Sequence, residues 1–168
     1  MYKEVKFSDL SKELLEQLQK GAFLTVKSAS KVNTMTIAWG SIGFMWNKPI
    51  FMTMVRYSRF TYELIENSQD FTISLPLKGQ LRKELGICGT KSGRELDKID
   101  SCKLKLREGV SSATPILDDC DLHLECRIVY KQAMDELAVS PEIREACYPK
   151  GDYHILYYGE IVKAYIKS

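Results

Sequence analysis

The feature that most limits the fold of this chain is a series of short β-forming runs that do not alternate regularly with helices. These runs cover residues 22–27, 34–39, 49–56, 71–75, 122–130 and 154–166. Strands left at the edge of a sheet can pair with other chains, and closing the sheet removes such edges. We therefore predict a mainly β or α+β chain built on a closed or partly closed antiparallel barrel, with short helices in its connections.

A leucine pattern near the N-terminus predicts an amphipathic helix over about residues 8–20. We expect Ser8 to cap the start of this helix and Gly21 to end it. Further short helices are expected at 61–67 and 140–147, the second opened by a Ser-Pro pair. The leucines expected to share one face of the first helix are Leu10, Leu14, Leu15 and Leu18.

Three regions of the chain predict particular features of the barrel. The run 49–56 is almost continuously apolar, which predicts a strand buried on both faces. The last run contains Gly159, and a glycine within a strand often marks a bulge or a bend at a barrel corner. Residues 78–100 contain four glycines that interrupt short helical pieces, which indicates a loop-rich insertion between strands.

Composition excludes several classes of protein. A chain of 168 residues is the usual size of one domain, and we expect residues 1–168 to form one. The net charge of +2 argues against a nucleic-acid-binding protein and a polybasic membrane anchor. The five cysteines include no CxxC pair, which disfavours a disulfide scaffold and a structural zinc site. No run is apolar enough to be a membrane span or a signal peptide, so we expect a reduced, cytoplasmic protein.

The first candidate ligand-binding segment runs from Asn33 to Gly43. Small and hydrogen-bonding side chains lie here along a predicted strand that enters a glycine-containing turn. A flat heteroaromatic ligand lying edge-on to such a strand could use its exposed backbone groups. The alternative is that threonine and tryptophan are present only as good β-formers.

The second candidate segment runs from Arg56 to Thr61, between a predicted strand and a predicted helix. Two guanidinium groups, two hydroxyls and the N–H groups of a helix start come together, and this set suits a phosphate. In the alternative, Ser58 or Thr61 simply caps the helix and both arginines are solvated. Ser58 and Thr61 could both cap the helix and bind the phosphate.

The third candidate segment is residues 89–98. Ser92 and Glu95 have capping-box spacing, which by itself explains the pair, although the lysines and Arg94 could also reach an anion. The GxxxxGK[ST] spacing of an NTPase is absent. No serine or cysteine hydrolase motif and no metal-binding motif occurs in the chain. His123 and Cys126 would point to opposite faces of one strand, and Cys120 and Cys126 are expected to be either small buried apolar residues or surface thiols.

Several blocks of the sequence together resemble the flavin reductase-like family, and most closely its flavoredoxin-like branch. They appear in family order over roughly residues 20–165. The blocks are NTMTIAWG from Asn33, MWNKP from Met45, VRYSRFT from Val55, SGRELDK from Ser92, GDYH from Gly151 and GE at Gly159. The resemblance implies an antiparallel FMN-binding split β-barrel of Greek-key type, with FMN near the interface of a homodimer.

The resemblance also implies roles for individual residues. Those bordering the isoalloxazine ring and ribityl chain would be Asn33, Met35, Thr36, Ile37, Ala38 and Trp39. Those holding the phosphate would be Arg56, Ser58, Arg59 and Thr61, with Ser92 and Lys98 contributing from a crossing loop. The family pattern places a histidine directly after Gly-Asp, with four residues between that histidine and Gly-Glu. In this chain Tyr153 is inserted between Asp152 and His154. Counting back from Gly159 puts His154 at the position of the family's histidine, whereas counting forward from Gly151 puts Tyr153 there. His154 is thus either a catalytic residue near the flavin or nicotinamide, or a plain strand histidine.

The activity implied is NAD(P)H-dependent reduction of flavin, with FMN N5 accepting the hydride, a step that needs no side-chain general acid. One alternative is an electron carrier that keeps FMN bound and is reduced by a redox protein partner. A second alternative is a flavin-binding module without turnover. All three imply flavin as a ligand, no bound metal, and neither a nucleic acid nor a membrane as partner.

Overall fold

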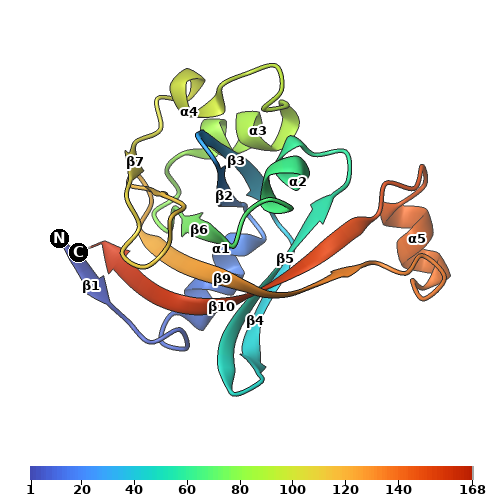
Figure 1. Ribbon diagram of the computed structural model, residues 1–168, viewed down its shortest axis with the longest axis horizontal. Coiled ribbons are helices and arrows are strands. Elements are labelled where there is room, and N and C mark those ends of the chain that lie inside the picture. Colours follow the sequence, from blue (N-terminus) through green and yellow to red (C-terminus); the bar gives the residue numbers. More distant parts are fainter. Residues whose placement is uncertain (168) are drawn as a thin grey trace.

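Eight strands form the main sheet of the computed structural model, which describes residues 1–167 (Figure 1). Along the sheet the order is β3-β2-β6-β9-β10-β5-β4, with β1 added to the far end of β10, and all neighbours are antiparallel. The strands are β1 (Tyr2–Glu4), β2 (Ala22–Ser28), β3 (Lys31–Ile37), β4 (Gly40–Met45), β5 (Lys48–Arg56), β6 (Asp70–Leu75), β9 (Leu122–Ala133) and β10 (His154–Lys167). A separate pair joins β7 (Leu106–Arg107) to β8 (Ile116–Leu117).

The connection between β3 and β4 curls this sheet into a barrel. The two strands lie at opposite ends of the hydrogen-bonded path, yet only Ala38 and Trp39 separate them in sequence. Because consecutive Cα atoms are about 3.8 Å apart, such a link spans at most about 11 Å. The ends of the sheet must therefore approach each other without pairing. This arrangement confirms the predicted antiparallel split barrel.

Gly159 bends β10 where the strand crosses the barrel. The register of β10 against β9 shifts between Tyr158 and Gly159. A Cβ atom at Gly159 would lie 2.6 Å from the Phe71 ring and 2.7 Å from the Cys126 Cβ, so a side chain would collide with the core there. The bulge predicted from this glycine is confirmed, and the C-terminal run is one bent strand.

Five short helices lie in the connections. They are α1 (Ser11–Leu18), α2 (Phe60–Ile65), α3 (Arg82–Thr90), α4 (Lys98–Ser101) and α5 (Pro141–Cys147). The predicted cap of α5 is confirmed, since the Ser140 hydroxyl accepts a hydrogen bond from the Ile143 N–H. The predicted cap of α1 is wrong: Leu10 occupies that position, with no side-chain cap. Leu15 was expected on the buried face of α1 but is 43% exposed.

Two expectations about strands are also wrong. The glycine-containing turn expected after residue 39 is strand β4, which pairs with β5 along its whole length. Strand β5 is not buried on both faces, because Met52, Met54 and Arg56 are half-exposed while Thr53 and Val55 are buried. The alternation gives β5 one face toward the barrel interior and another toward a recess in the surface.

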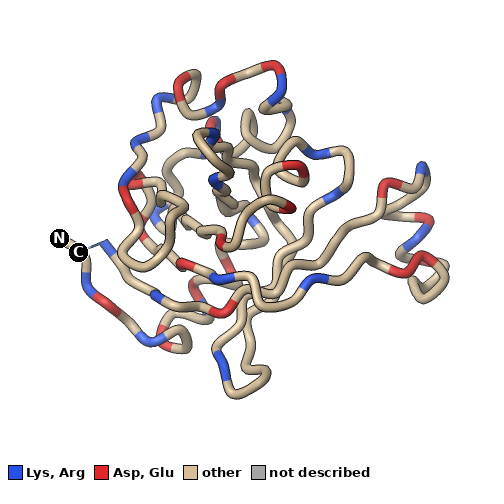
Figure 2. Tube along the Cα trace, viewed as in Figure 1, with Lys and Arg blue, Asp and Glu red and all other residues tan. Residues whose placement is uncertain are grey.

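The main core fills the barrel, and a smaller cluster lies where α3 packs beside β2 and β8. The smaller cluster comprises Phe23, Leu85, Cys88, Leu104, Leu117 and Cys120. Cys120 and Cys126 are fully buried, as expected for small apolar residues. Charges of both signs are spread over the surface, while the β4–β5 hairpin is almost uncharged (Figure 2). No helix within residues 1–167 combines the length and the apolarity that crossing a membrane requires.

Candidate functional site

Two adjoining hollows lie beside the outer edge of β3. The first, which we call the strand hollow, has a volume of about 240 Å³ and the second, the loop hollow, about 130 Å³. The strand hollow is lined by Met35, Thr36, Ile37, Ala38, Trp39, Met54, Arg56, Arg59 and His154. The loop hollow is lined by Met35, Ser58, Arg59, Phe60, Thr61, Thr90, Lys91, Ser92, Gly93, Arg94 and Lys98. Met35 and Arg59 line both, so the two hollows adjoin, and we call them together the recess.

The strand hollow lies against the open edge of the barrel. Strand β3 pairs only with β2, so no strand within residues 1–167 occupies its other edge. Ala38 and Trp39 lie between β3 and β4 and belong to neither ladder. Backbone N–H and C=O groups in this position can hydrogen-bond to a ligand. The Trp39 side chain is 46% exposed beside them.

His154 reaches the strand hollow as a neutral imidazole. Burial, followed by the charge of Arg56, lowers the pKa of His154 from 6.5 to about 4. Its Nδ1 atom lies 2.7 Å from the Tyr148 hydroxyl, and its ring centroid lies 5.5 Å from that of Trp39. Tyr153 lies outside the hollow and stacks on Tyr148. Of the two registers that the sequence left open, the structure places His154 in the recess.

Arg56 faces the strand hollow and fastens the segment before β10. Its guanidinium donates to the Asp152 carbonyl at 2.7 Å and the Cys147 carbonyl at 2.9 Å, and lies over the Tyr148 ring. The Asp152 carboxylate in turn accepts from the Ser58 N–H and the Ser58 hydroxyl. Of the expected phosphate cluster, Arg56 shares the strand hollow with Arg59, whereas Ser58, Arg59 and Thr61 line the loop hollow without Arg56.

The loop hollow is lined by cationic side chains, and the loop that forms it packs tightly on β3. The Arg59 guanidinium donates one hydrogen bond, to the Gly89 carbonyl at 3.1 Å, and retains other N–H groups. The Lys91 ammonium has no hydrogen bond or ion pair with residues 1–167. A Cβ atom at Gly93 would overlap the Asn33 side chain and lie 2.6 Å from the Phe60 ring. Glycine at this position lets the loop pack directly on β3.

Other polar side chains of the loop hollow bond mainly to the protein itself. The buried Lys98 ammonium donates to the Thr34 carbonyl at 3.0 Å and the Cys88 carbonyl at 3.1 Å. Burial, with a smaller effect of the Arg59 charge, lowers the pKa of Lys98. The Thr61 hydroxyl accepts from the Asn33 amide at 2.8 Å, so Asn33 orients Thr61 without lining either hollow.

Both capping alternatives considered for these segments are wrong. Helix α2 has Arg59 at its N-cap and no side-chain cap, so neither Ser58 nor Thr61 serves that purpose. The Ser92 hydroxyl accepts from the Arg94 N–H, and residues 93–95 form a turn. The next helix, α4, is capped by the Asp97 side chain.

Several lining residues were not among those expected. They are Met54, Phe60, Thr90, Lys91, Gly93 and Arg94. Alternation along β5 gives a signal for Met54, which lies two residues before Arg56 and shares its face. Lys91 and Arg94 belong to the segment singled out as able to reach an anion. The Arg94 guanidinium, however, bonds to the Glu63 carboxylate and the Ser58 carbonyl.

The donor set of the recess suits an organic anion rather than a metal. Within residues 1–167 there is no group of three or more histidine, cysteine, aspartate or glutamate side chains able to hold a metal ion. The recess instead combines free cationic N–H groups at one end with an open strand edge at the other. Such an arrangement fits a ligand with a phosphate joined to a flat polar ring.

Comparison with known proteins identifies relatives of this chain. A curated protein of Archaeoglobus fulgidus, described as uncharacterized, is 29% identical over 107 residues, which is 64% of this chain. The chain spans 59% of the length of that relative. The structure of flavoredoxin from Methanosarcina acetivorans is 26% identical, with a TM-score of 0.68 over 88% of this chain and 68% of that chain.

The fold is shared more widely. The FMN-binding domain of a flavin reductase-like enzyme from Shewanella baltica is 20% identical, with a TM-score of 0.70 over 99% of this chain and 77% of that chain. The family model of the flavin reductase like domain matches residues 19–168, which include every residue of both hollows. The chain therefore belongs to the flavin reductase-like family, a family of flavin-binding oxidoreductases with a split-barrel fold.

Proposed function

We propose that this protein binds FMN across the strand hollow and the loop hollow and catalyses NAD(P)H-dependent flavin reduction. The observation that carries the proposal is that the two hollows adjoin at Met35 and Arg59, which line both. A cationic recess thereby adjoins an open strand edge with aromatic groups beside it. FMN has one phosphate and one flat heteroaromatic ring, so the residues present fit it.

At the phosphate end, we assign as phosphate ligands the side chains that still have N–H or O–H donors not bonded to the protein. Arg59 retains N–H groups beyond its bond to Gly89, and Lys91 has a free ammonium. The Ser92 hydroxyl accepts one hydrogen bond and can still donate one. The Thr61 hydroxyl likewise accepts one hydrogen bond, from Asn33, and can still donate one. Ser58 and Lys98 line this end, but their polar atoms donate to the protein, so they shape the recess more than they neutralise charge.

At the ring end, we assign the edge of β3 to the polar rim of the flavin. Ile37, Ala38 and Trp39 would present backbone groups, while Met35, Thr36 and Met54 would pack against the ring. His154 is neutral at pH 7, so it would act as a hydrogen-bonding group and not as a fixed charge.

The chemistry follows from the cofactor, since bound FMN supplies a ring nitrogen, N5, that accepts hydride from a nicotinamide. The residues of the strand hollow would hold the ring at the open edge of β3, beside the half-exposed Trp39. His154 and Arg56 line the same hollow. No side-chain acid has to deliver a proton.

A second candidate function is electron transfer with FMN retained and a redox protein as donor. The observation favouring it is the similarity to flavoredoxin of Methanosarcina acetivorans, at 26% identity over 88% of this chain. The two functions share the same recess and differ in the electron donor.

The test begins with the absorbance spectrum of purified protein loaded with FMN and passed through gel filtration. Retained flavin bands that bleach anaerobically with NADH or NADPH would support the reductase. Bleaching only with a reduced redox protein would favour the carrier, and a flavin that bleaches with neither would indicate a binding module. Protein that neither retains FMN nor reduces added FMN at the expense of NAD(P)H would refute all three.

A matched pair of variants tests the phosphate end. Arg59→Gln should weaken FMN binding about tenfold or more, because a charge-assisted hydrogen bond to phosphate contributes roughly 1.5–3 kcal/mol. Arg144→Gln, on the exposed helix α5, should leave FMN affinity unchanged. Equal affinities in the two variants would remove Arg59 from the phosphate site.

We further propose a cytoplasmic homodimer. Support comes from exposed aromatic side chains around the nearly uncharged β4–β5 hairpin, where the exposed Phe44 stacks on Phe7 and the exposed Trp46 lies beside Tyr130. Large exposed apolar groups in one area are typical of an interaction surface. A monomer mass in sedimentation at micromolar concentration would contradict the dimer.

A further inference from the structure

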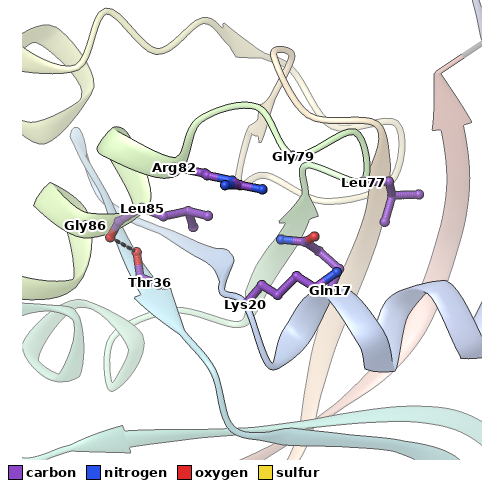
Figure 3. A pocket seen from close by; sticks show the side chains of 8 residues that line it. All are labelled: Gln17, Lys20, Thr36, Leu77, Gly79, Arg82, Leu85 and Gly86. Carbon is purple, nitrogen blue, oxygen red and sulfur yellow. Dashed lines mark hydrogen bonds between the residues drawn. The ribbon is translucent and has the colours of Figure 1, made fainter.

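A cavity that was not expected from the sequence lies next to the strand hollow. Its volume is about 520 Å³, and we call it the α1–α3 cavity. Thr36 lines both this cavity and the strand hollow, so the two are neighbours across β3. The Thr36 hydroxyl donates to the Leu85 carbonyl at 2.6 Å, which fixes α3 beside this strand (Figure 3).

Two cationic side chains enter this cavity from different elements. Figure 3 shows Lys20, which follows α1, and Arg82, which begins α3, with the Gln17 amide between them in this view. Within residues 1–167 neither cation has a hydrogen bond, an ion pair or a ring contact. An exposed lysine or arginine is common on a surface. Two that face one cavity without an acidic partner indicate a place for an anion.

The start of α3 adds to this positive character. Leu81 occupies the N-cap in a left-handed conformation, with φ of 61°, and no side chain caps the nine-residue helix. The first turn of a helix carries partial positive charge and N–H groups without partners in the helix. Arg82, Leu85 and Gly86 bring that turn to the cavity wall.

The remaining residues that line the cavity supply apolar surface and a hydrogen-bond acceptor, which a site for a simple inorganic anion would not need. Leu77 and Leu85 supply an apolar wall. The buried Gln17 amide donates to the Gly21 carbonyl at 2.9 Å, which leaves its Oε1 atom without a partner among residues 1–167. A carbonyl oxygen accepts hydrogen bonds from hydroxyl or amino groups. Anionic, hydroxyl-bearing and flat apolar parts occur together in a nucleotide.

We propose that the α1–α3 cavity is a nucleotide subsite that binds the phosphate-bearing part of the nicotinamide dinucleotide, with Lys20 and Arg82 on its phosphates. This inference rests on the proposed function, because it assumes a nicotinamide donor at the strand hollow. Because Thr36 lines both spaces, we expect an extended dinucleotide at the strand hollow to reach the α1–α3 cavity. Either the pyrophosphate or a 2′-phosphate could meet the two cations, and the experiment separates these sources.

The probes are ADP-ribose and 2′-phospho-ADP-ribose, which carry the phosphates but no nicotinamide and cannot donate hydride. Calorimetric titration of FMN-loaded protein measures their affinities. We expect the Lys20→Gln/Arg82→Gln double variant to bind the recognised probe at least tenfold more weakly than the parent protein. An effect on both probes would assign the pyrophosphate to the cations, and an effect on the 2′-phospho probe alone would assign the 2′-phosphate.

A matched control is the Lys12→Gln/Lys83→Gln double variant, which removes the same charge from α1 and α3 outside the cavity. It should keep the affinity of the parent protein. Arg82→Lys, which keeps the charge, should retain part of the binding and shows that loss of binding in the test variant does not come from misfolding. Equal affinity in the test and control variants, or no binding of either probe, would overturn the subsite.

Failure of the subsite and failure of the proposed function can be told apart. If NAD(P)H bleaches the flavin equally in the parent protein and in the test variant, the proposed function stands and the subsite is refuted. If neither nicotinamide bleaches the flavin but the probes bind through Lys20 and Arg82, the nicotinamide donor is refuted and a nucleotide site remains.

Discussion

At the scale of single residues, the Tyr148 hydroxyl determines which nitrogen of His154 carries the proton. The pKa of Tyr148 is raised by burial and that of His154 is lowered to about 4, so both are neutral at pH 7. No other acceptor for the Tyr148 hydroxyl exists among residues 1–167, so it donates to His154 Nδ1. The proton of His154 therefore resides on Nε2, which has no protein partner within those residues.

We predict that Tyr148→Phe changes the tautomer of His154. The parent protein should show the Nε2–H tautomer at pH 7, and the variant should show a mixture and a higher pKa, because the neutral form loses a hydrogen bond. Two-bond ¹H–¹⁵N NMR spectra measure this directly, since the chain contains only two histidines. An unchanged tautomer in Tyr148→Phe would contradict the assignment.

The control for this experiment is Tyr153→Phe. The Tyr153 ring stacks on Tyr148 with a centroid distance of 4.7 Å, but its hydroxyl makes no contact with His154. Its substitution should leave both imidazole spectra unchanged. His123, whose Nδ1 lies 3.1 Å from the Ser74 hydroxyl, serves as an internal reference in every sample.

Gly93 carries a second prediction at this scale. In Gly93→Ala the new methyl group would overlap Asn33 and the Phe60 ring, so the loop must move away from β3. We expect FMN affinity to fall at least tenfold, with a loss of stability of about 1–3 kcal/mol from overpacking. Gly43→Ala, where an added methyl group meets nothing within 4 Å, should change neither. Equal FMN affinities would show that the loop does not hold the phosphate.

The sequence predicts the types of residue at the site better than their partners. The cationic character of the Arg56–Thr61 segment is visible from sequence alone, and the structure places Arg59 between the two hollows. The bonds of Arg56 to Cys147 and Asp152 join residues 91 and 96 positions apart. No local pattern encodes such distant contacts, because they depend on where the barrel brings β5 and β10 together.

At the scale of elements, the segment between α5 and β10 is fastened to the turn after β5. Asp152 makes two hydrogen bonds to Ser58 through its carboxylate and accepts one from Arg56 through its carbonyl. Its φ of 57° is left-handed, a conformation that glycine adopts without strain. Asp152→Gly therefore removes the carboxylate contacts without adding backbone strain.

We predict that Asp152→Gly loosens this attachment locally. The Ser58 amide should exchange its hydrogen at least tenfold faster, because its acceptor is lost. Amides of the central strands β6 and β9 should keep their protection. Asp135→Gly, in the loop after β9, serves as the control and should leave Ser58 unaffected. Hydrogen exchange followed by mass spectrometry or NMR measures these rates, and slow exchange at Ser58 in Asp152→Gly would contradict the attachment.

Most elements of this chain could be predicted from sequence, and the exceptions have a physical reason. Apolar β-forming runs indicated β2, β3, β5, β6, β9 and β10, and the Ser-Pro pair indicated α5. Strand β4 was missed because two glycines interrupt its pattern, and its pairing partner β5 supplies the hydrogen bonds that hold it extended. Strands β1, β7 and β8 are two or three residues long, too short to show a period.

At the scale of the whole molecule, closure of the barrel creates the site. The short link between β3 and β4 draws the ends of the sheet together but leaves the outer edge of β3 without a strand partner. The strand hollow lies at that opening, and the loop hollow lies where α2 and the loop after α3 cover it. Short β-forming runs predicted a barrel, but the shape of its opening depends on pairing between strands distant in sequence.

The barrel also buries both histidines of the chain, which predicts how its stability depends on pH. Burial lowers the pKa values of His123 and His154 from 6.5 to about 4. Between these values the unfolded chain binds protons that the folded protein does not, so the free energy of unfolding falls as the pH falls. We expect a loss of about 2 kcal/mol for each histidine between pH 7 and pH 5.

Urea unfolding at pH 7, 6 and 5 measures this loss, mostly above the range in which carboxylates titrate. The lowered pKa values of Glu66, Asp118, Asp121 and Glu160 add a further loss that becomes large only below about pH 5. His123→Gln and His154→Gln should each halve the change between pH 7 and pH 5, whatever their stability at pH 7. A pH dependence as steep in both variants as in the parent protein would mean that the barrel does not keep these imidazoles neutral.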